Sequence, residues 1–183
     1  MAKLADSGER REFESGAVRD LAEGKGRMDL VPLDVAARFL AKYKSAEVER
    51  TFQEGAALVL NLMGGFIKSC REAHPDDNYI YTAMVIESQI LFPDPYTTIM
   101  EVSKQYEDGA KKYSDRNWEK GLPVRSFLDS AMRHLMKVGR NDPEDPEPVS
   151  VHAKGALWNL FSLAWTIKHH PELLQEFIKD IQI

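Results

Sequence analysis

The sequence predicts an all-α fold, an antiparallel helical bundle with an extended N-terminal arm and an inserted helical segment. Apolar residues recur three and four positions apart through most of the chain after residue 31, the spacing of helices that bury one face. Apart from one ambiguous segment, no stretch reads as a strand with a partner. The 183 residues suffice for one domain with a sizeable core, or for one domain with an appended helical lobe.

We expect residues 1–31 to form the arm and residues 32–183 the helical domain. From Ser7 to Asp29 the chain is charged and rich in glycine without sustained periodicity, which indicates an arm or loop that contributes to the site. Pro32 then suits the first turn of a helix. The apolar face of that helix contains Ala36, Phe39, Leu40 and Tyr43.

Residues 45–95 look like an insertion made of two helical patterns. The first runs from Ala46 toward Ala73, and Gly64 and Gly65 are the positions at which it could bend or end. The second, YIYTAMVIESQILF, contains residues that favour strands, but it also fits a helical stripe and has no strand partner elsewhere. We therefore expect a helical lobe or a dimer surface.

Four helices are predicted in the rest of the chain. The first covers residues 96–113, with Glu107 among the charged residues of its solvent face. The second begins at Ser126, with Asp129 three residues later as in a capping box, and ends near residue 138. The remaining two are expected over residues 150–169, the most apolar stretch, and 171–181, which opens with a proline.

Composition and charge restrict the class of partner and the compartment. The formal net charge is −5 with both signs spread along the chain, which argues against polymeric nucleic acid as a partner. Cys70 is the single cysteine, so a disulfide framework within the chain is excluded and a reducing compartment fits. The N-terminus has no apolar export segment, and the longest apolar run is too short for a bilayer. We expect a cytoplasmic protein without a membrane partner.

Two basic stretches could hold an anion. EGKGRMD places Lys25 and Arg27 on a glycine-flanked backbone that can approach a ligand closely. GAKKYSDRNWEKG combines cations with aromatic rings, which suits phosphates beside a stacked base, although a solvated helix end is the alternative. Neither stretch has the GxxxxGK pattern of a phosphate-binding loop. The candidate binding residues of the second stretch are Lys112, Tyr113, Arg116, Asn117 and Trp118.

Polar residues of two predicted helices could form a pocket inside the bundle. His152 and Asn159 are seven residues apart on the most apolar helix, so they share a face. The preceding helix contains Asp129, Arg133 and His134 in the stretch DSAMRH. In the functional interpretation His134, His152 and Asn159 face one another across the two helices. In the alternative, the buried histidine and asparagine form an internal hydrogen-bond pair, and Asp129 pairs with Arg133 on the surface.

The loop NDPEDPEP between these helices is rich in carboxylates. Asp142, Glu144, Asp145 and Glu147 offer the oxygen ligands that hard divalent cations prefer. A loop of this kind at the mouth of a bundle could supply a metal that also touches phosphates. The ordinary alternative is a solvated acidic turn.

Three stretches resemble signature blocks of one known family. They are ESGAVRDLAEGKGRMDLVP, YEDGAKKYSDRNWEKGLPVRSFLDSAMRHLMK and VHAKGALWNLFSLAW, a little under half of the chain. The family is the N-terminal domain of phage-associated dATP/dGTP diphosphohydrolases of the MazZ type, similar to MazG-type nucleotide pyrophosphohydrolases. The resemblance implies an α-helical fold, Mg²⁺ or Mn²⁺ as the cofactor, a homo-oligomer, and the host cytoplasm as the location.

The resemblance also implies a reaction, the hydrolysis of purine deoxynucleoside triphosphates to the monophosphate and pyrophosphate by a metal-activated water. The candidate catalytic residues are then Asp129, His134, His152 and Asn159. The candidate metal ligands are Asp129, Asp142, Asp145 and His152. The candidate substrate-binding residues are Lys25, Arg27, Lys112, Tyr113, Arg116, Asn117, Trp118 and Arg133.

The sequence departs from the MazG-type metal pattern. That pattern places acidic residues, EExxE and ExxD, on two facing helices. No EExxE occurs here, and Ala156 and Asn159 stand where the acids of ExxD are expected. Metal ligation then has to come from other groups. The alternative function is a non-catalytic nucleotide- or protein-binding helical module that kept the fold and lost the metal site.

Overall fold

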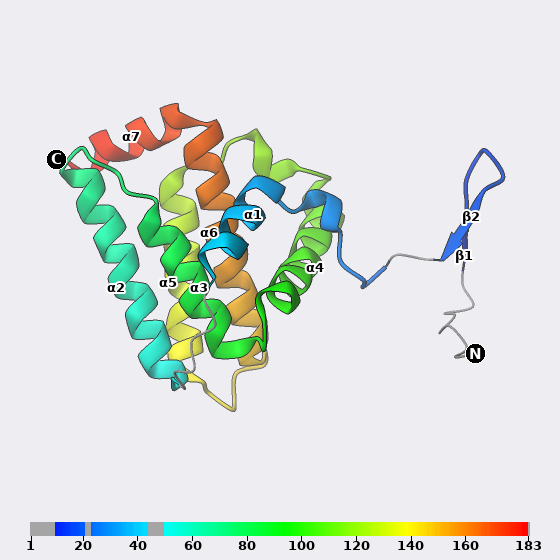
Figure 1. Ribbon diagram of the computed structural model, residues 1–183, viewed down its shortest axis with the longest axis horizontal. Coiled ribbons are helices and arrows are strands. Elements are labelled where there is room, and N and C mark those ends of the chain that lie inside the picture. Colours follow the sequence, from blue (N-terminus) through cyan, green and yellow to red (C-terminus); the bar gives the residue numbers. More distant parts are fainter. Residues whose placement is uncertain (1–9, 21–22, 44–49, 183) are drawn as a thin grey trace.

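The computed structural model describes residues 10–20, 23–43 and 50–182, and these form a helical bundle with one small β-hairpin (Figure 1). The predicted all-α class is confirmed. No described helix is long and apolar enough to cross a bilayer. The α-helices are α1 Leu33–Lys42, α2 Phe52–Arg71, α3 Asn78–Leu91, α4 Pro95–Tyr113, α5 Val124–Arg140, α6 Val149–His169 and α7 Pro171–Ile181. The shorter elements are strands β1 Arg10–Glu12 and β2 Val18–Asp20 and 3-10 helices η1 Met28–Leu30 and η2 Asn117–Lys120.

Helix α6 lies at the centre of the bundle, and α1, α3, α4, α5 and α7 all pack against it. This helix was expected to be the most apolar one, and Leu157, Leu160 and Phe161 are completely buried on it. Because a short loop joins α5 to α6, the two helices are antiparallel neighbours. Any polar side chain on the inner face of α6 therefore lies inside the bundle, where it needs a partner or a ligand.

Helices α2 and α3 belong to the same core. The apolar stripe of α2, including Val59, Met63 and Phe66, is buried against α3 and α5, so it covers the core of this chain instead of forming a free surface. Helix α2 continues through Gly64 and Gly65 without a break. The expected start of this helix at Ala46 lies outside the described residues. The ambiguous segment before residue 92 is helical, as expected.

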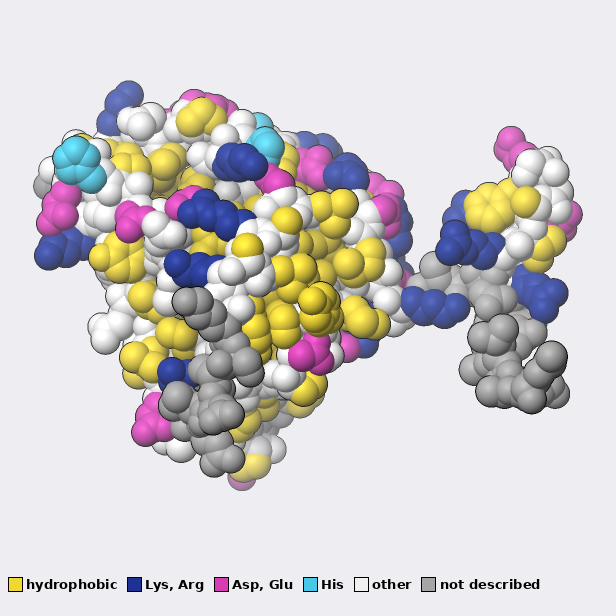
Figure 2. Space-filling model, viewed as in Figure 1, with side chains coloured by type: hydrophobic (Ala, Val, Ile, Leu, Met, Phe, Trp, Pro, Cys, Tyr) yellow, Lys and Arg dark blue, Asp and Glu magenta, His cyan; other side chains and the backbone are white. Residues whose placement is uncertain are grey.

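The described part of the N-terminal arm has two regions. Strands β1 and β2 form an antiparallel hairpin that stands away from the helical body beyond α4 (Figures 1 and 2). The following loop is bound to α4 by Glu107, whose carboxylate accepts the backbone N–H groups of Gly24 and Gly26, both at 2.8 Å. Glu107 was expected on the solvent face of its helix, but its side chain is only 8% exposed. The arm covers that face, which corrects the expectation.

The start of α5 also differs from the sequence prediction. The helix begins at Val124, after Pro123, and no side chain caps its N-terminus. Ser126 therefore lies within the first turn instead of at the cap, and its hydroxyl makes no hydrogen bond within the described chain. The cap position is occupied by Pro123, so the helix starts three residues earlier than a cap at Ser126 would allow.

Candidate functional site

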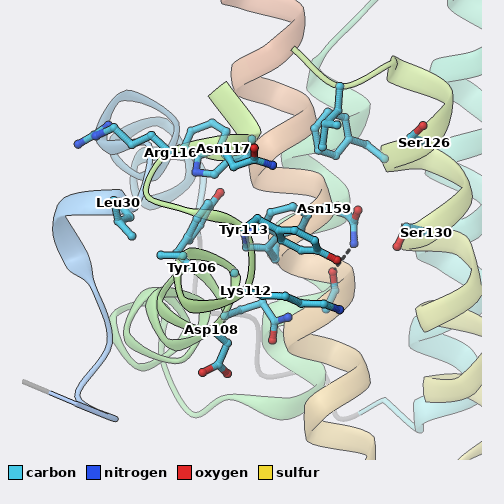
Figure 3. A pocket seen from close by; sticks show the side chains of 18 of the residues that line it. Leu30, Tyr106, Asp108, Lys112, Tyr113, Arg116, Asn117, Ser126, Ser130 and Asn159 are labelled. Carbon is cyan, nitrogen blue, oxygen red and sulfur yellow. Dashed lines mark hydrogen bonds between the residues drawn. The ribbon is translucent and has the colours of Figure 1, made fainter. Parts of the chain in front are cut away.

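A cleft of about 610 Å³ opens between α4, η2, α5 and α6 (Figure 3). Helix α5 contributes Ser126, Ser130 and His134, which are spaced four residues apart and so lie in one row. Helix α6 contributes Gly155 and Asn159, which form the facing row. Two stretches that the sequence singled out thus meet in one place. Of the predicted site residues, those lining the cleft are Lys112, Tyr113, Arg116, Asn117, Trp118, His134 and Asn159.

The contact between His134 and Gly155 explains why a glycine lies on the inner face of α6. A Cβ atom at position 155 would be 2.7 Å from the imidazole of His134, closer than atoms can pack. The glycine therefore allows the ring to lie against α6. Asn159 donates from Nδ2 to the carbonyl oxygen of Gly155 at 2.7 Å, which fixes the orientation of its amide. The expected internal pair of His152 with Asn159 does not form, because the asparagine bonds to its own helix instead.

The cations of GAKKYSDRNWEKG have different environments. Lys112 extends into the cleft beside the Tyr113 ring, with its Nζ 5.1 Å from the ring centre, and it makes no ion pair within the described chain (Figure 3). Arg116 pairs with Glu119 and donates to the carbonyl oxygen of Asp29 at 2.6 Å, so its guanidinium helps to bind the arm. Lys112 is thus the lysine of this stretch that lines the cleft, and it is free to meet a ligand there.

The two aromatic residues of this stretch also differ. Tyr113 is 61% exposed at the rim of the cleft. Trp118 is buried, and its ring lies 5.3 Å from that of Tyr106 and 4.8 Å from that of Trp165. Trp118 therefore forms part of the packed wall, and Tyr113 is the ring that a ligand can reach without rearrangement.

Lys25 and Arg27 do not line this cleft. They lie in a separate groove between the arm and α4. Arg27 forms ion pairs with Asp29 at 2.7 Å and Asp115 at 2.9 Å, and these hydrogen bonds raise the pKa of the guanidinium above its ordinary value. Its charge is therefore already compensated. Lys25 is exposed and has no ion-pair partner in the described ranges.

Asp129 and Arg133 lie on the outer side of α5. They form an ion pair with each other, and both side chains are largely exposed. Asp129 borders a second hollow with Phe177 and Ile181 and does not line the cleft, and Arg133 lines neither. The structure therefore does not bring these two residues together with His134 and Asn159. Instead, Asp129 and Arg133 pair with each other on the surface, which was the alternative interpretation of the sequence.

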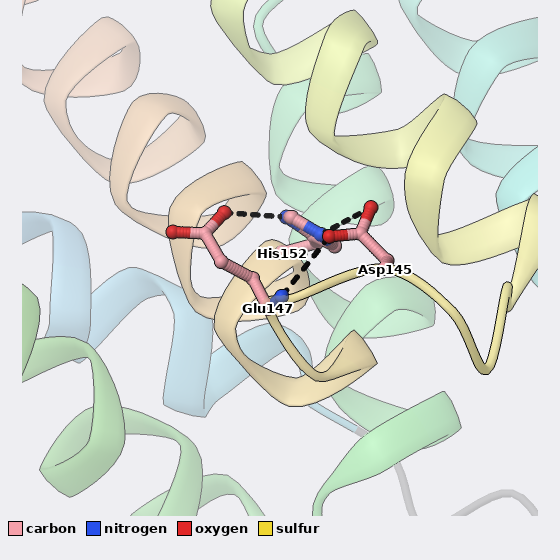
Figure 4. Close-up of side chains that lie close together, drawn as sticks. All are labelled: Asp145, Glu147 and His152. Atoms are coloured by element: carbon pink, nitrogen blue, oxygen red, sulfur yellow. Dashed lines mark hydrogen bonds and ion pairs between the residues drawn. The ribbon is translucent and has the colours of Figure 1, made fainter.

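The acidic loop and α6 form a cluster of three potential metal ligands, Asp145, Glu147 and His152 (Figure 4). His152 Nε2 lies 3.4 Å from Asp145 Oδ2, and His152 Nδ1 lies 3.7 Å from Glu147 Oε2. The imidazole is only 2% exposed, and neither ring nitrogen has a hydrogen-bond partner in the described chain. Asp142 is outside the cluster, since it pairs with Arg140 at 2.8 Å.

The charge of Asp145 is favoured by its surroundings. The backbone N–H of Glu147 donates to Asp145, and Lys137 lies 3.3 Å away, which together hold the pKa of the carboxyl below its ordinary value. A carboxylate that stays ionised beside a buried imidazole is a suitable ligand for a divalent cation.

The cleft and the cluster are adjacent. The ring centres of His134, which lines the cleft, and His152, which belongs to the cluster, are 5.6 Å apart. Burial, and then the neighbouring His152, lower the pKa of His134, so its imidazole is neutral at neutral pH. Sequence reasoning missed Ser130 and did not single out Glu147 from the other acids of its loop. The four-residue spacing of Ser126, Ser130 and His134 was the available signal for the serine.

The fold and the site define a helical-bundle protein with a polar cleft beside a carboxylate and histidine cluster. The family model for dATP/dGTP diphosphohydrolase, N-terminal, matches residues 81–176, just over half of the chain, and the chain belongs to this family. A curated relative, the dATP/dGTP diphosphohydrolase of Salmonella phage PMBT28, is 30% identical over 71 residues, which is 39% of this chain. The chain spans about a quarter of that relative, since the match covers 24% of its length. No solved structure matches.

The matched residues contain α4, α5 and α6, most of α3, the first half of α7 and the acidic cluster. They include every residue that lines the cleft except Leu30. They begin inside the segment 45–95 and leave the arm outside. The predicted insertion and the predicted contribution of the arm to the site remain predictions.

Proposed function

We propose that the chain hydrolyses purine deoxynucleoside triphosphates to the monophosphate and pyrophosphate, with Mg²⁺ or Mn²⁺ bound by Asp145, Glu147 and His152. The observation that carries this proposal is the position of His134, which joins a nucleotide-sized cleft to the acidic cluster. Membership of the family and the name of the phage relative support the same reaction.

The three cluster residues fit a divalent cation. Two carboxylates and an imidazole are a donor set that Mn²⁺ accepts more readily than Mg²⁺, which prefers oxygen ligands and retained waters. The buried His152 supplies an independent argument, because an imidazole with two unpartnered nitrogens is costly unless something binds there. When bound, the metal supplies charge neutralisation for the phosphates and a lowered pKa for an attacking water.

The residues of the cleft have distinct roles in this proposal. Lys112 attracts the phosphate chain, since it is the uncompensated cation that extends into the cleft. Tyr113 offers its exposed ring to the base or sugar. His134 lies where the cleft meets the cluster and holds the phosphates next to the metal ligands. Arg27 and Arg116 hold the arm in place through Asp115 and the carbonyl oxygen of Asp29, and Arg116 also lines the cleft.

The test is to incubate the purified chain with each of the four deoxynucleoside triphosphates and Mn²⁺ or Mg²⁺, and to separate the products. We expect monophosphate and pyrophosphate from the purine substrates, and we expect His152→Ala to lose both Mn²⁺ binding and turnover. His74→Ala is the matched control, because His74 is exposed and belongs neither to the lining of the cleft nor to the acidic cluster. A His152→Ala variant that melts early but binds Mn²⁺ normally would contradict the metal role.

The rival function is nucleotide binding without turnover. It is favoured by the lining of the cleft, where Asp108 is the sole carboxylate among the described residues. Purine nucleotide binding without release of pyrophosphate under either metal would establish this rival and overturn the hydrolase proposal. Oligomerisation and the exclusion of polymeric nucleic acid remain predictions.

A further inference from the structure

We propose that Asn159 recognises the exocyclic amino group of the purine base, and that the nucleotide lies along α6 with its base at Asn159 and its phosphates at His152. This inference rests on the proposed function for the choice of ligand, and it assigns a role in specificity that the reaction alone does not require.

The first step of the argument is the orientation of the Asn159 amide. Its Nδ2 donates to the carbonyl oxygen of Gly155 at 2.7 Å, and only the nitrogen end of an amide can donate. The Oδ1 atom is therefore turned away from that carbonyl, toward the cleft wall that α5 provides (Figure 3). It accepts no hydrogen bond from the described chain, and the residue is only 5% exposed. The oxygen is not among the completely buried unpartnered atoms, so it is accessible from the cleft and can accept from a ligand that brings a donor.

The second step concerns the surroundings of this acceptor. Ser126 and Ser130 line the same region from α5, and neither hydroxyl has a hydrogen-bond partner among the described residues. A hydroxyl group can donate or accept, so the two serines can adapt to either pattern of purine ring nitrogens. Asn159 Oδ1 can only accept. The fixed acceptor therefore fits an amino group, which guanine has at position 2 and adenine at position 6. Hypoxanthine has neither amino group, and its N1–H is a donor that guanine shares.

The third step is the distance along the helix. His152 and Asn159 are seven residues apart, which places them about 10 Å apart along α6. Because α5 is antiparallel to α6, Ser126 lies toward the Asn159 end of the cleft and His134 lies toward the His152 end. Both walls therefore change from amide and hydroxyl groups at one end to imidazole groups at the other. Lys112 reaches into the cleft from α4 (Figure 3). This polarity matches a nucleotide with an uncharged base at one end and phosphates at the other.

The experiment compares dGTP with dITP, which differs only by lacking the amino group at position 2. Both affinity and kcat/KM are measured for the wild-type chain, for Asn159→Ala, and for the exposed control Asn61→Ala. The wild type and the control are expected to favour dGTP by about tenfold or more, because dITP has no amino group to donate to Asn159. In Asn159→Ala the two nucleotides are expected to become equivalent through a loss on dGTP.

The outcomes separate this inference from the proposed function. Equal treatment of dGTP and dITP by the wild type overturns the inference, even where both are hydrolysed. Preferential binding of dGTP that depends on Asn159, without hydrolysis, supports the inference and overturns the hydrolase proposal. If Asn159→Ala melts below the assay temperature, the preference of the wild type decides the inference. A second pair is then added, dATP and the triphosphate of purine deoxyriboside, which differ only by the amino group at position 6. A preference retained by folded Asn159→Ala overturns the assignment.

Discussion

Glu87 on α3 should make the stability of this chain strongly dependent on pH. Its side chain is 0% exposed, and neither carboxylate oxygen has a hydrogen-bond partner in the described chain. Burial raises the pKa of this carboxyl from its ordinary 4.5 to about 8. The folded state therefore retains a proton that the unfolded state releases, and this retention costs free energy at neutral pH.

The magnitude follows from the two pKa values. Below pH 4.5 both states carry the proton, so the stability is unaffected; above that value the free energy of unfolding falls until the pH passes about 8. Each pH unit in this interval removes about 1.4 kcal/mol, so the cost at pH 7 is about 3 kcal/mol. Glu87→Gln keeps the shape and removes the ionisation. We expect it to stabilise the chain by most of this amount at pH 7 and very little at pH 4.5.

Urea unfolding at several pH values between 4.5 and 8.5 measures this difference directly. Glu176→Gln is the matched control, because it makes the same substitution at an exposed position on α7. A Glu87→Gln variant whose stability differs from that of the wild type by the same amount at pH 5 and pH 8 would refute the reasoning. The carboxyl would then have a partner that keeps it ionised in the folded state.

Two further substitutions test the packing of the helices and the arm. Gly65→Ala places a Cβ atom 2.5 Å from the Tyr79 ring, so it should lower the free energy of unfolding in urea by about 1–3 kcal/mol. Gly64→Ala is the control: its Cβ atom would meet nothing within 4 Å, so the substitution should be neutral or slightly stabilising. Glu107→Ala removes the acceptor of two backbone N–H groups, so trypsin should cleave after Arg27 faster with little change in the melting temperature of the bundle. An unchanged cleavage rate would show that other contacts suffice to bind the arm.

The sequence predicted the helices well because their signal is local. Apolar spacing alone identified the central helix, and the absence of a strand partner correctly assigned residues 78–91 to a helix. Glu107 could not be placed in the same way. Its burial results from a loop more than 80 residues earlier in the chain, and a charged residue on the polar side of an amphipathic helix otherwise indicates solvent.

The site was predictable as a set of stretches but not in all its residues. On α5 the pair Asp129 and Arg133 and the pair Ser130 and His134 have the same four-residue spacing, one position apart. Spacing shows that each pair shares a face, yet it does not show which face meets α6. The packing of His134 against Gly155 decides this, and it turns Asp129 outward.

The distribution of charge in the site supports the part of the proposal that assigns a metal to the reaction. Arg27 and Arg116 are compensated by Asp29, Asp115 and Glu119, which leaves Lys112 as the free cation of the cleft in the described chain. One lysine cannot balance a triphosphate, and the carboxylates beyond His134 would repel it across a short distance. A divalent cation reverses that repulsion, because carboxylates and phosphates then share it as ligands. The proposed binding of phosphates in the cleft therefore depends on the proposed metal site, and metal binding by His152 and its two carboxylates is the decisive property to measure.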